Sequence, residues 1–245
     1  ISEWKNIFKR KSLEFVICTN LTLMDERKLK WLKGHKVYIS TSIDGPLSIH
    51  NINRPLQDTD NSFDLVVNKI EQTRNFLGND SVSALMTTTS YSLGRFPEII
   101  DSYRDLGFNS IFLRSLNPYG FAKRDKHHLA YPMDTFIENY KDGLDYIIQL
   151  NLEGEYFSEI FASIILSRIL TPFSTGFVDL QSPAGIGIAG VIYDYDGDVY
   201  VSDEGRMLAA SGDKTFKIGN VRKNTYQEIF NGKYLHYLIE NSCAE

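Results

Sequence analysis

Polar side chains lie at or just after the ends of four short apolar runs of this sequence, and their types could bind a small charged ligand. Together they offer hydroxyl, amide, carboxylate and guanidinium groups: Thr19, Asn20, Ser42, Asp44, Thr87, Arg114 and Asn117. Such a set suits a ligand that carries hydroxyls, an ammonium group and a carboxylate, since each of those groups would find a complementary partner. The alternative is the ordinary polarity of loops that follow strands.

The four apolar runs are typical of short buried strands. They alternate with helical patterns and are bounded by Gly, Asn, Asp or Pro: Leu13–Cys18, Lys36–Ile43, Val82–Thr88 and Ser110–Leu116. Strands that recur after a helical crossover predict a parallel sheet, in which the carboxyl ends of the strands share one edge. We therefore expect a binding site at that edge, formed by four of the polar residues: Ser42, Asp44, Arg114 and Asn117.

The pattern changes after Thr171, where the sequence becomes rich in glycine. A turn at Asp196–Gly197, followed by alternating residues, predicts two antiparallel strands at roughly Gly190–Tyr195 and Asp198–Ser202. The predicted fold is α/β. We expect a partial parallel (β/α) barrel over residues 1–170 and a C-terminal cap that contains a β-hairpin over residues 171–245.

Composition limits the class of protein. The chain has 245 residues, of which 42% are hydrophobic, and this is enough for a sizeable core. A net charge of −5 argues against a surface that coats nucleic acid. No apolar run approaches the length needed to span a bilayer, so we expect no membrane partner. Two cysteines, Cys18 and Cys243, are too few for a disulfide framework and indicate a reducing, cytoplasmic setting.

Two stretches carry a family resemblance: "VICTNLTLMDERKLKWL" (Val16–Leu32) and "VYISTSIDGPLSIHNINRP" (Val37–Pro55). They resemble the middle of radical S-adenosylmethionine enzymes, where a Thr-Asn-Gly-Thr-Leu-type turn precedes Ser-hydrophobic-Asp-Gly-Pro, a His and an Arg. Ser42, Asp44, His50 and Arg54 fill that pattern, whereas Leu21 stands where the family has Gly. The resemblance implies that Ser42, Asp44, Arg114 and Asn117 bind S-adenosylmethionine at the third to sixth strands of a partial barrel.

A later stretch, "SPAGIG…DYDGDVYVSDEGRM", resembles the SPASM cap, which holds auxiliary iron–sulfur clusters through Cys and Gly-x4-Cys. Those Cys positions fall on Ala184 and Ser202, and Cys243 would open a further Cys-x2-Cys pair as a metal ligand. "IFLRSLNPYGFA" (Ile111–Ala122) and "DEGRML" further resemble maturases of His-Xaa-Ser peptides, so the implied partner is a precursor peptide. Asp203 matches an acidic position that accepts a proton from the substrate radical. Its alternative is an ordinary solvated carboxylate.

The sequence lacks the C-x3-C-x2-C loop that holds the catalytic 4Fe–4S cluster of this family. Soft thiolates hold such clusters, and neither alanine nor serine replaces them. We therefore expect no cofactor in this chain, whereas an intact member carries S-adenosylmethionine and 4Fe–4S clusters. Two hypotheses remain open. The chain is a catalytically inactive fragment or degenerate copy, truncated at both ends, of a radical peptide maturase, or it is a non-catalytic peptide-binding pseudoenzyme.

Overall fold

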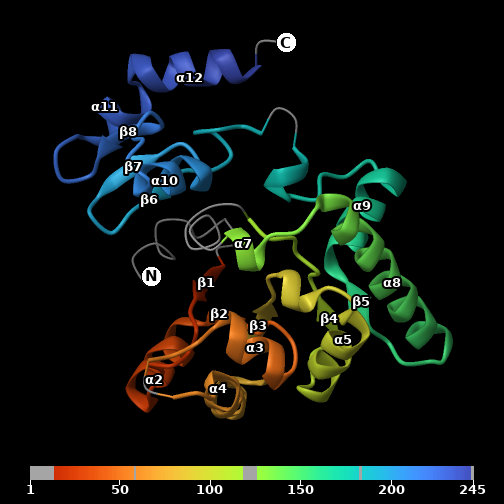
Figure 1. The fold of residues 1–245 in the computed structure, drawn as a ribbon. Helices are drawn as coiled ribbons and strands as arrows, with labels where there is room; N and C mark the ends of the chain where they lie inside the picture. Colours follow the sequence, from red (N-terminus) through yellow and green to blue (C-terminus); the bar gives the residue numbers. More distant parts are fainter. Residues whose placement is uncertain (1–13, 58, 118–125, 182–183, 244–245) are drawn as a thin grey trace. The chain divides into compact units, whose positions relative to one another are not determined.

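The structure, a computed structural model, describes residues 14–57, 59–117, 126–181 and 184–243 (Figure 1). The chain forms two compact units. The first comprises Ile1–Leu116 and His127–Ser163, and the second comprises Asn117–Lys126 and Ile164–Glu245.

The first unit is built on parallel strands. Strands β1 (Phe15–Cys18), β2 (Val37–Ser42) and β3 (Val82–Leu85) form one sheet in that order, with Ser42 opposite Leu85. Strands β4 (Ser110–Ile111) and β5 (Ser158–Glu159) form a second parallel pair. The predicted parallel α/β architecture is confirmed. These two short sheets do not by themselves establish the predicted partial barrel.

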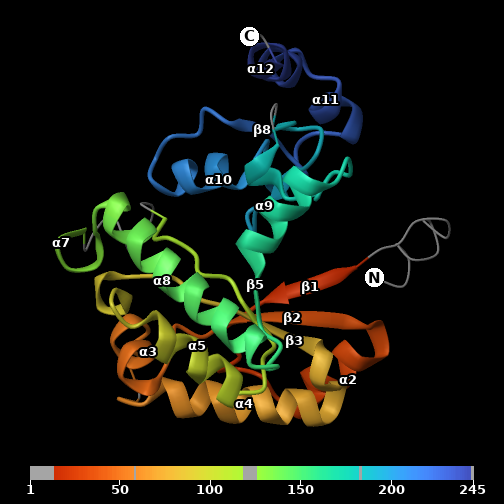
Figure 2. The same ribbon diagram turned by 90° about the vertical axis from the view of Figure 1, so that its right-hand side faces the viewer.

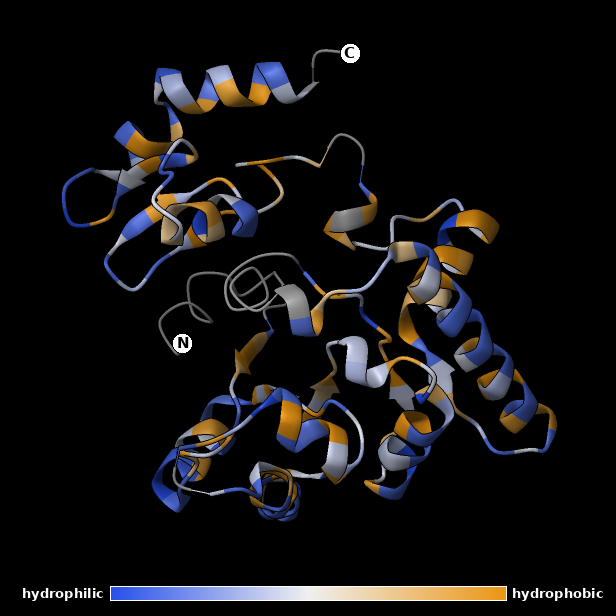
Figure 3. Ribbon diagram, in the orientation of Figure 1, coloured by the Kyte–Doolittle hydropathy of each residue, from blue (hydrophilic) through white to orange (hydrophobic). Residues whose placement is uncertain are grey.

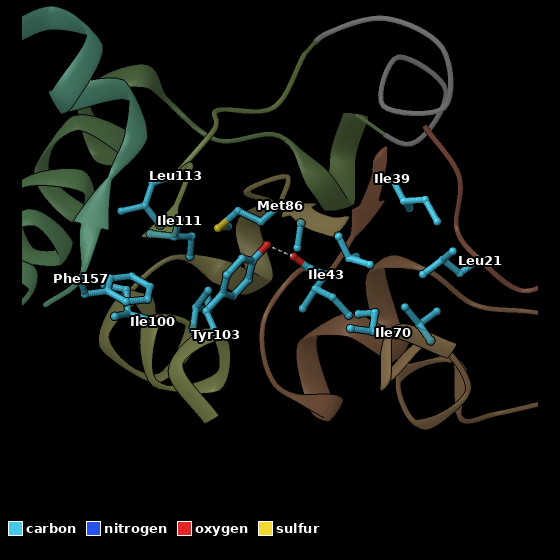
Figure 4. Packing of buried hydrophobic residues seen from close by; sticks show 14 of the residues in the cluster. Leu21, Ile39, Ile43, Ile70, Met86, Ile100, Tyr103, Ile111, Leu113 and Phe157 are labelled. Atoms are coloured by element: carbon cyan, nitrogen blue, oxygen red, sulfur yellow. Dashed lines mark hydrogen bonds between the residues drawn. The ribbon is translucent and has the colours of Figure 1, made fainter. Parts of the chain in front are cut away.

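Helices cover one face of the first sheet, as α2 (Glu26–His35) and α4 (Ser62–Leu77) do in Figure 2. Both begin at a capping side chain, because Asp25 accepts from the Lys28 amide and Asn61 accepts from the Asp64 amide. The unit also contains α3 (Leu47–Asn53), α5 (Phe96–Asp105), α7 (Lys126–Leu129), α8 (Met133–Leu152), and the 3₁₀ helices η1 (Asn79–Ser81) and η2 (Ser90–Ser92). Helix α9 (Ile160–Leu170) begins in this unit. One apolar core joins the strands to α2, α3, α4, α5 and α8 (Figure 4).

Leu21, at the position where the resemblance places a glycine, has an unusual backbone. Its φ is 63°, in the left-handed region that side chains with a Cβ rarely adopt. The turn is held by the Leu21 amide, which donates to the Thr19 hydroxyl, and by the Leu21 carbonyl, which accepts from the Met24 amide. The Leu21 side chain is 0% exposed, so its burial in the core offsets the backbone strain.

The second unit contains the predicted hairpin. Strands β6 (Ile192–Tyr193) and β7 (Asp198–Tyr200) pair antiparallel within the predicted ranges, with Ile192 opposite Tyr200. The sequence did not predict β8 (Lys217–Asn220), which pairs with the other side of β7. Strand β7 is therefore central and buried, whereas a simple hairpin would leave it at an edge.

Helices complete the second unit. They are η3 (Val178–Leu180), α10 (Asp203–Ala210), α11 (Tyr226–Phe230) and α12 (Lys233–Cys243). Apolar and polar residues alternate along α12, as they do along α8 of the first unit (Figure 3), which is the pattern of amphipathic surface helices. No helix within the described ranges is long and apolar enough to cross a membrane.

Candidate functional site

The sheet of the first unit has one face that helices cover and one more exposed face, which we call the polar face for its serines although Val16, Tyr38 and Leu85 also lie on it. Val37, Ile39 and Thr41 of β2 are buried on the helix-covered side, and alternation places Ser40 and Ser42 on the other side. In β3 the buried residues are Val82 and Ala84, so Ser83 lies on the polar face with Ser42. This polar face is where the strands present side chains that helices α2 and α4 do not cover.

The chain segments that follow β2, β3 and β4 are hydrogen-bonded side by side. The Ile43 amide donates to the Leu85 carbonyl over 3.1 Å, and the Thr88 amide donates to the Arg114 carbonyl over 2.9 Å. Ser42 and Arg114 therefore lie at the same, carboxyl edge of the strands, as the sequence predicted. Ile111 and Leu113 are buried in the core, so alternation turns Arg114 toward the polar face.

Three side chains at this edge are free to meet a ligand. Within the part of the chain that the structure describes, the hydroxyls of Ser42 and Thr87 have no hydrogen-bond partner, and the exposed Arg114 guanidinium has no ion pair. Ser42 and Thr87 are half-buried, so a ligand could reach their hydroxyls. A guanidinium and two hydroxyls together can bind a carboxylate and neighbouring hydroxyl groups.

Asp44 differs from these residues because its carboxylate is already occupied. It is 1% exposed, and Arg54 grips it with Nε at 2.7 Å from Oδ2 and Nη2 at 3.0 Å from Oδ1. The Thr87 amide also donates to Oδ1 over 3.0 Å. Little of this carboxylate is left to face a ligand directly, so the predicted contact between Asp44 and a cofactor has no geometric support here.

His50 packs beside this pair and is neutral. Its Nδ1 accepts from the Asp44 amide over 3.3 Å, its ring meets Phe63 edge-on, and its Nε2 has no protein partner among the described residues. Burial lowers the pKa of His50 to about 4, although the neighbouring Asp44 carboxylate partly opposes this shift. The imidazole therefore acts as a hydrogen-bond acceptor within the core.

In the second unit, Ala184 and Ser202 line the same cavity, which has a volume of about 420 Å³. Ile192, Val201 and Asp203 also line it. Both positions at which the resemblance places cluster cysteines therefore border this space. Ser202 has a structural task as well, because its hydroxyl accepts from the Gly205 amide over 3.2 Å and caps α10. The Ser-Asp-Glu-Gly sequence is typical of a helix start, and this signal was missed.

Comparison with known proteins identifies relatives of this chain. No family model matches it. Cysteine-type anaerobic sulfatase-maturating enzymes from two Clostridium perfringens strains, strain 13 and strain ATCC 13124, are 24% and 23% identical to it. Each alignment covers 97% of this chain and 61% of the relative. The chain is homologous to these maturating enzymes. The resemblance to radical S-adenosylmethionine peptide maturases is thereby confirmed, whereas the narrower one to His-Xaa-Ser maturases stays a prediction.

Solved structures of an anaerobic sulfatase-maturating enzyme have a similar fold. Native anSMEcpe with bound AdoMet and Kp18Cys peptide is 22% identical, with a TM-score of 0.76 over 99% of this chain and 64% of that one. A histidine-tagged form of anSMEcpe with bound AdoMet has the same TM-score over 100% of this chain and 61% of that one. The present chain therefore spans less than two thirds of the length of these maturating enzymes.

The cap residues do not fit an iron–sulfur cluster of the kind found in radical maturases. Ala184 has no ligand atom, and the Ser202 hydroxyl is engaged in the helix cap. Among the described residues, no group of three or more His, Cys, Asp or Glu side chains could hold a metal ion. Cys243 ends α12, and its side chain lies outside the described part, so its predicted metal role stays a prediction.

Two further residues of the predicted sites are Asp203 and Asn117. Asp203 is the first residue of α10, and its Oδ1 accepts from Arg206 Nε over 2.9 Å. Asn117 falls in the second unit, so its convergence with Ser42 stays a prediction. Parts of the motifs used for the family resemblance, residues 118–122 and 182–183, lie outside the described residues.

Asp198 follows the predicted turn in the sequence, and the structure makes it a buried ionic centre. It is 3% exposed. Its carboxylate lies 2.5 Å from Lys217 Nζ and 3.1 Å from Lys214 Nζ, and it accepts from the side-chain Nδ2 of Asn220 over 2.7 Å. Burial alone would raise the pKa of Asp198, but the hydrogen bonds from Asn220 and the two lysines hold it well below its usual range. This centre ties β7 to β8 within the second unit.

Proposed function

We propose that this chain supplies part of the surface on which a radical peptide maturase holds S-adenosylmethionine and its peptide substrate. The observation that carries the proposal is the carboxyl edge of β2 to β4. There, the free groups of Ser42, Thr87 and Arg114 gather in a homologue of enzymes whose solved structures include bound AdoMet. Both the activity and the peptide substrate belong to this proposal.

Each free group has a natural counterpart on S-adenosylmethionine. The Arg114 guanidinium suits the methionine carboxylate, because a charge-assisted pair with two parallel hydrogen bonds is strong and directional. The Ser42 and Thr87 hydroxyls suit the ribose hydroxyls. When bound, S-adenosylmethionine is the radical source of this enzyme class. The cysteines needed for the activating cluster do not occur in these 245 residues.

In this proposal, Asp203 accepts a proton from the peptide. Asp203 is one of the residues that line the cavity of the second unit, and its carboxylate is ion-paired with Arg206. Carboxylates positioned in this way serve as general bases in many enzymes. The competing role is structural, since an acidic residue in the first turn of a helix also stabilises that helix.

The experiment is a calorimetric titration of the full chain with S-adenosylmethionine. Replacing Arg114 with Met should weaken binding about 10- to 100-fold, and Ser42→Ala should weaken it several-fold. Ser83→Ala is the matched control, because Ser83 lies on the same face but its hydroxyl donates to the Ile39 carbonyl. Equal effects of Ser42→Ala and Ser83→Ala would contradict the proposed site.

A second candidate is a pseudoenzyme that binds peptide without chemistry. The observation that favours it is the capping role of Ser202, which replaces a cluster ligand with a structural contact. Anaerobic incubation with iron and sulfide should then leave no stoichiometric acid-labile sulfide on the chain, while a labelled Cys-containing peptide still binds. Retained sulfide would contradict the absence of a cluster, and lack of peptide binding would contradict the pseudoenzyme.

A further inference from the structure

We propose that Asp44 is a positioning residue, which sets the spacing between the Ser42 and Thr87 hydroxyls at the ligand-facing edge. This inference rests on the proposed function, because those hydroxyls are the groups assigned to the ligand. It replaces the simpler expectation that Asp44 itself contacts the cofactor. We call the arrangement of Asp44, His50, Arg54 and Thr87 the Asp44 clamp.

The clamp connects the ends of two neighbouring strands. Asp44 comes two residues after Ser42, and its Oδ1 accepts from the amide of Thr87, the residue that carries the second hydroxyl. One carboxylate oxygen therefore joins the segment after β2 to the segment after β3. Any displacement of this oxygen changes the distance between the two segments, and with it the fit of a ligand that contacts both.

The carboxylate cannot turn away from this position. Arg54 holds both oxygens in a bidentate grip, and the Asp44 amide is fixed by His50 Nδ1. A planar guanidinium fork fixes the orientation of a carboxylate, which a single ammonium does not do. Arg54 directly follows α3, so this helix fixes the position from which Arg54 holds the Asp44 carboxylate.

The backbone on either side of Asp44 is also fixed. The buried Tyr103 hydroxyl donates to the Ile43 carbonyl over 2.6 Å (Figure 4). Gly45 has a φ of 121°, and a Cβ there would lie 2.8 Å from Ile99 Cγ1, so the chain passes against the core where a side chain would not fit. With the segment held on both sides, the contact to Thr87 determines the geometry of the edge.

The test measures ligand binding and the exchange of the Thr87 amide in the full chain. Asp44→Asn places an amide group against the Arg54 donors, so we expect S-adenosylmethionine to bind at least about 10-fold more weakly and the Thr87 amide to exchange faster. Arg54→Lys keeps the charge but loses the fork, and it should give an intermediate loss. Asp198→Asn is the control, a buried carboxylate with basic partners in the other unit, and should leave both readouts unchanged.

A double variant distinguishes a positioning role of Asp44 from a purely stabilising one. If Asp44 acts through the two hydroxyls, Ser42→Ala should weaken binding less in the Asp44→Asn background than in the wild type. Equal losses in both backgrounds, or unchanged binding in Asp44→Asn, would overturn the inference. A wild-type chain that does not bind S-adenosylmethionine would contradict the proposed function instead. In that case the Thr87 amide of Arg54→Lys still tests the clamp, and unchanged exchange would overturn it.

Discussion

Among the residues that the structure describes, each unit buries one aspartate beside basic side chains, and the two are used differently. In the first unit Asp44 meets a single arginine through two bonds and also joins the ends of two strands. In the second unit Asp198 meets two lysines and an asparagine around the middle strand of a small sheet. The first arrangement orients the carboxylate through one planar fork at the candidate site, whereas the second distributes the contacts over several separate side chains. A buried carboxylate can therefore position a site or hold a sheet together, depending on its partners.

The largest expected effect is on stability when Asp44 is removed. Asp44→Ala leaves the Thr87 amide and the inner face of Arg54 without a partner, so it should cost about 3–5 kcal/mol. Asp198→Ala should cost about 2 kcal/mol, because Lys214 and Lys217 are more exposed and can return to water. Urea unfolding followed by tryptophan fluorescence reports the first unit, because Trp31 lies in α2 of that unit. Circular dichroism follows both units. A larger loss from Asp198→Ala would reverse the comparison.

Acid should weaken the two units over different pH ranges. His50 has a pKa of about 4 when folded and about 6.5 when unfolded, so the unfolded chain binds the proton first. The first unit therefore loses up to about 3 kcal/mol as the pH falls from about 6.5 to about 4. The pKa of Asp198 is lowered by folding, so its contribution is lost only below the unfolded value of about 4.

Tryptophan-monitored urea unfolding at about pH 7 and about pH 5 tests this difference. His50→Phe should remove most of the pH dependence of the first unit, whereas His236→Gln, in the second unit, should keep it. Equal pH dependence in His50→Phe and the wild type would rule out the buried imidazole as its source.

A smaller difference, between two variants of Leu21, is expected because strain and burial oppose each other at this residue. Leu21→Ala keeps the strained φ and loses packing, so it should cost about 2–5 kcal/mol. Leu21→Gly loses as much packing but relieves about 1 kcal/mol of backbone strain. We therefore expect the glycine variant to have the higher urea midpoint. The reverse order would mean that the turn is unstrained.

The smallest effect concerns the cap of α10. Ser202→Ala removes the acceptor for the Gly205 amide and should cost about 1 kcal/mol. Ser202→Asp keeps an acceptor and should remain close to the wild type in thermal unfolding followed by circular dichroism. If alanine and aspartate behave alike, the hydroxyl is not a cap.

The sequence predicted those parts of the fold whose partners are close along the chain. The strand that ends at Ser42 and the hairpin around Gly197 depend on local alternation and a turn, so both are visible in the sequence. The burial of Asp198 was missed because its partner Lys214 lies 16 residues away and β8 carries little apolar pattern. Asp44 was identified as a site residue from its type and spacing, which fit a ligand. The Arg54 grip that occupies its carboxylate is visible only in three dimensions.

The left-handed backbone at Leu21 has a consequence for how this protein could change over generations. A change to glycine would relieve the turn but leave an unfilled space in the core, so it would be disfavoured as a single step. It becomes acceptable only if a neighbouring core residue grows to fill that space. Leu21 and the core residues around it therefore limit which replacements each of them can accept. In natural variants of this chain, the residue at position 21 should change together with the volume of the side chains around it.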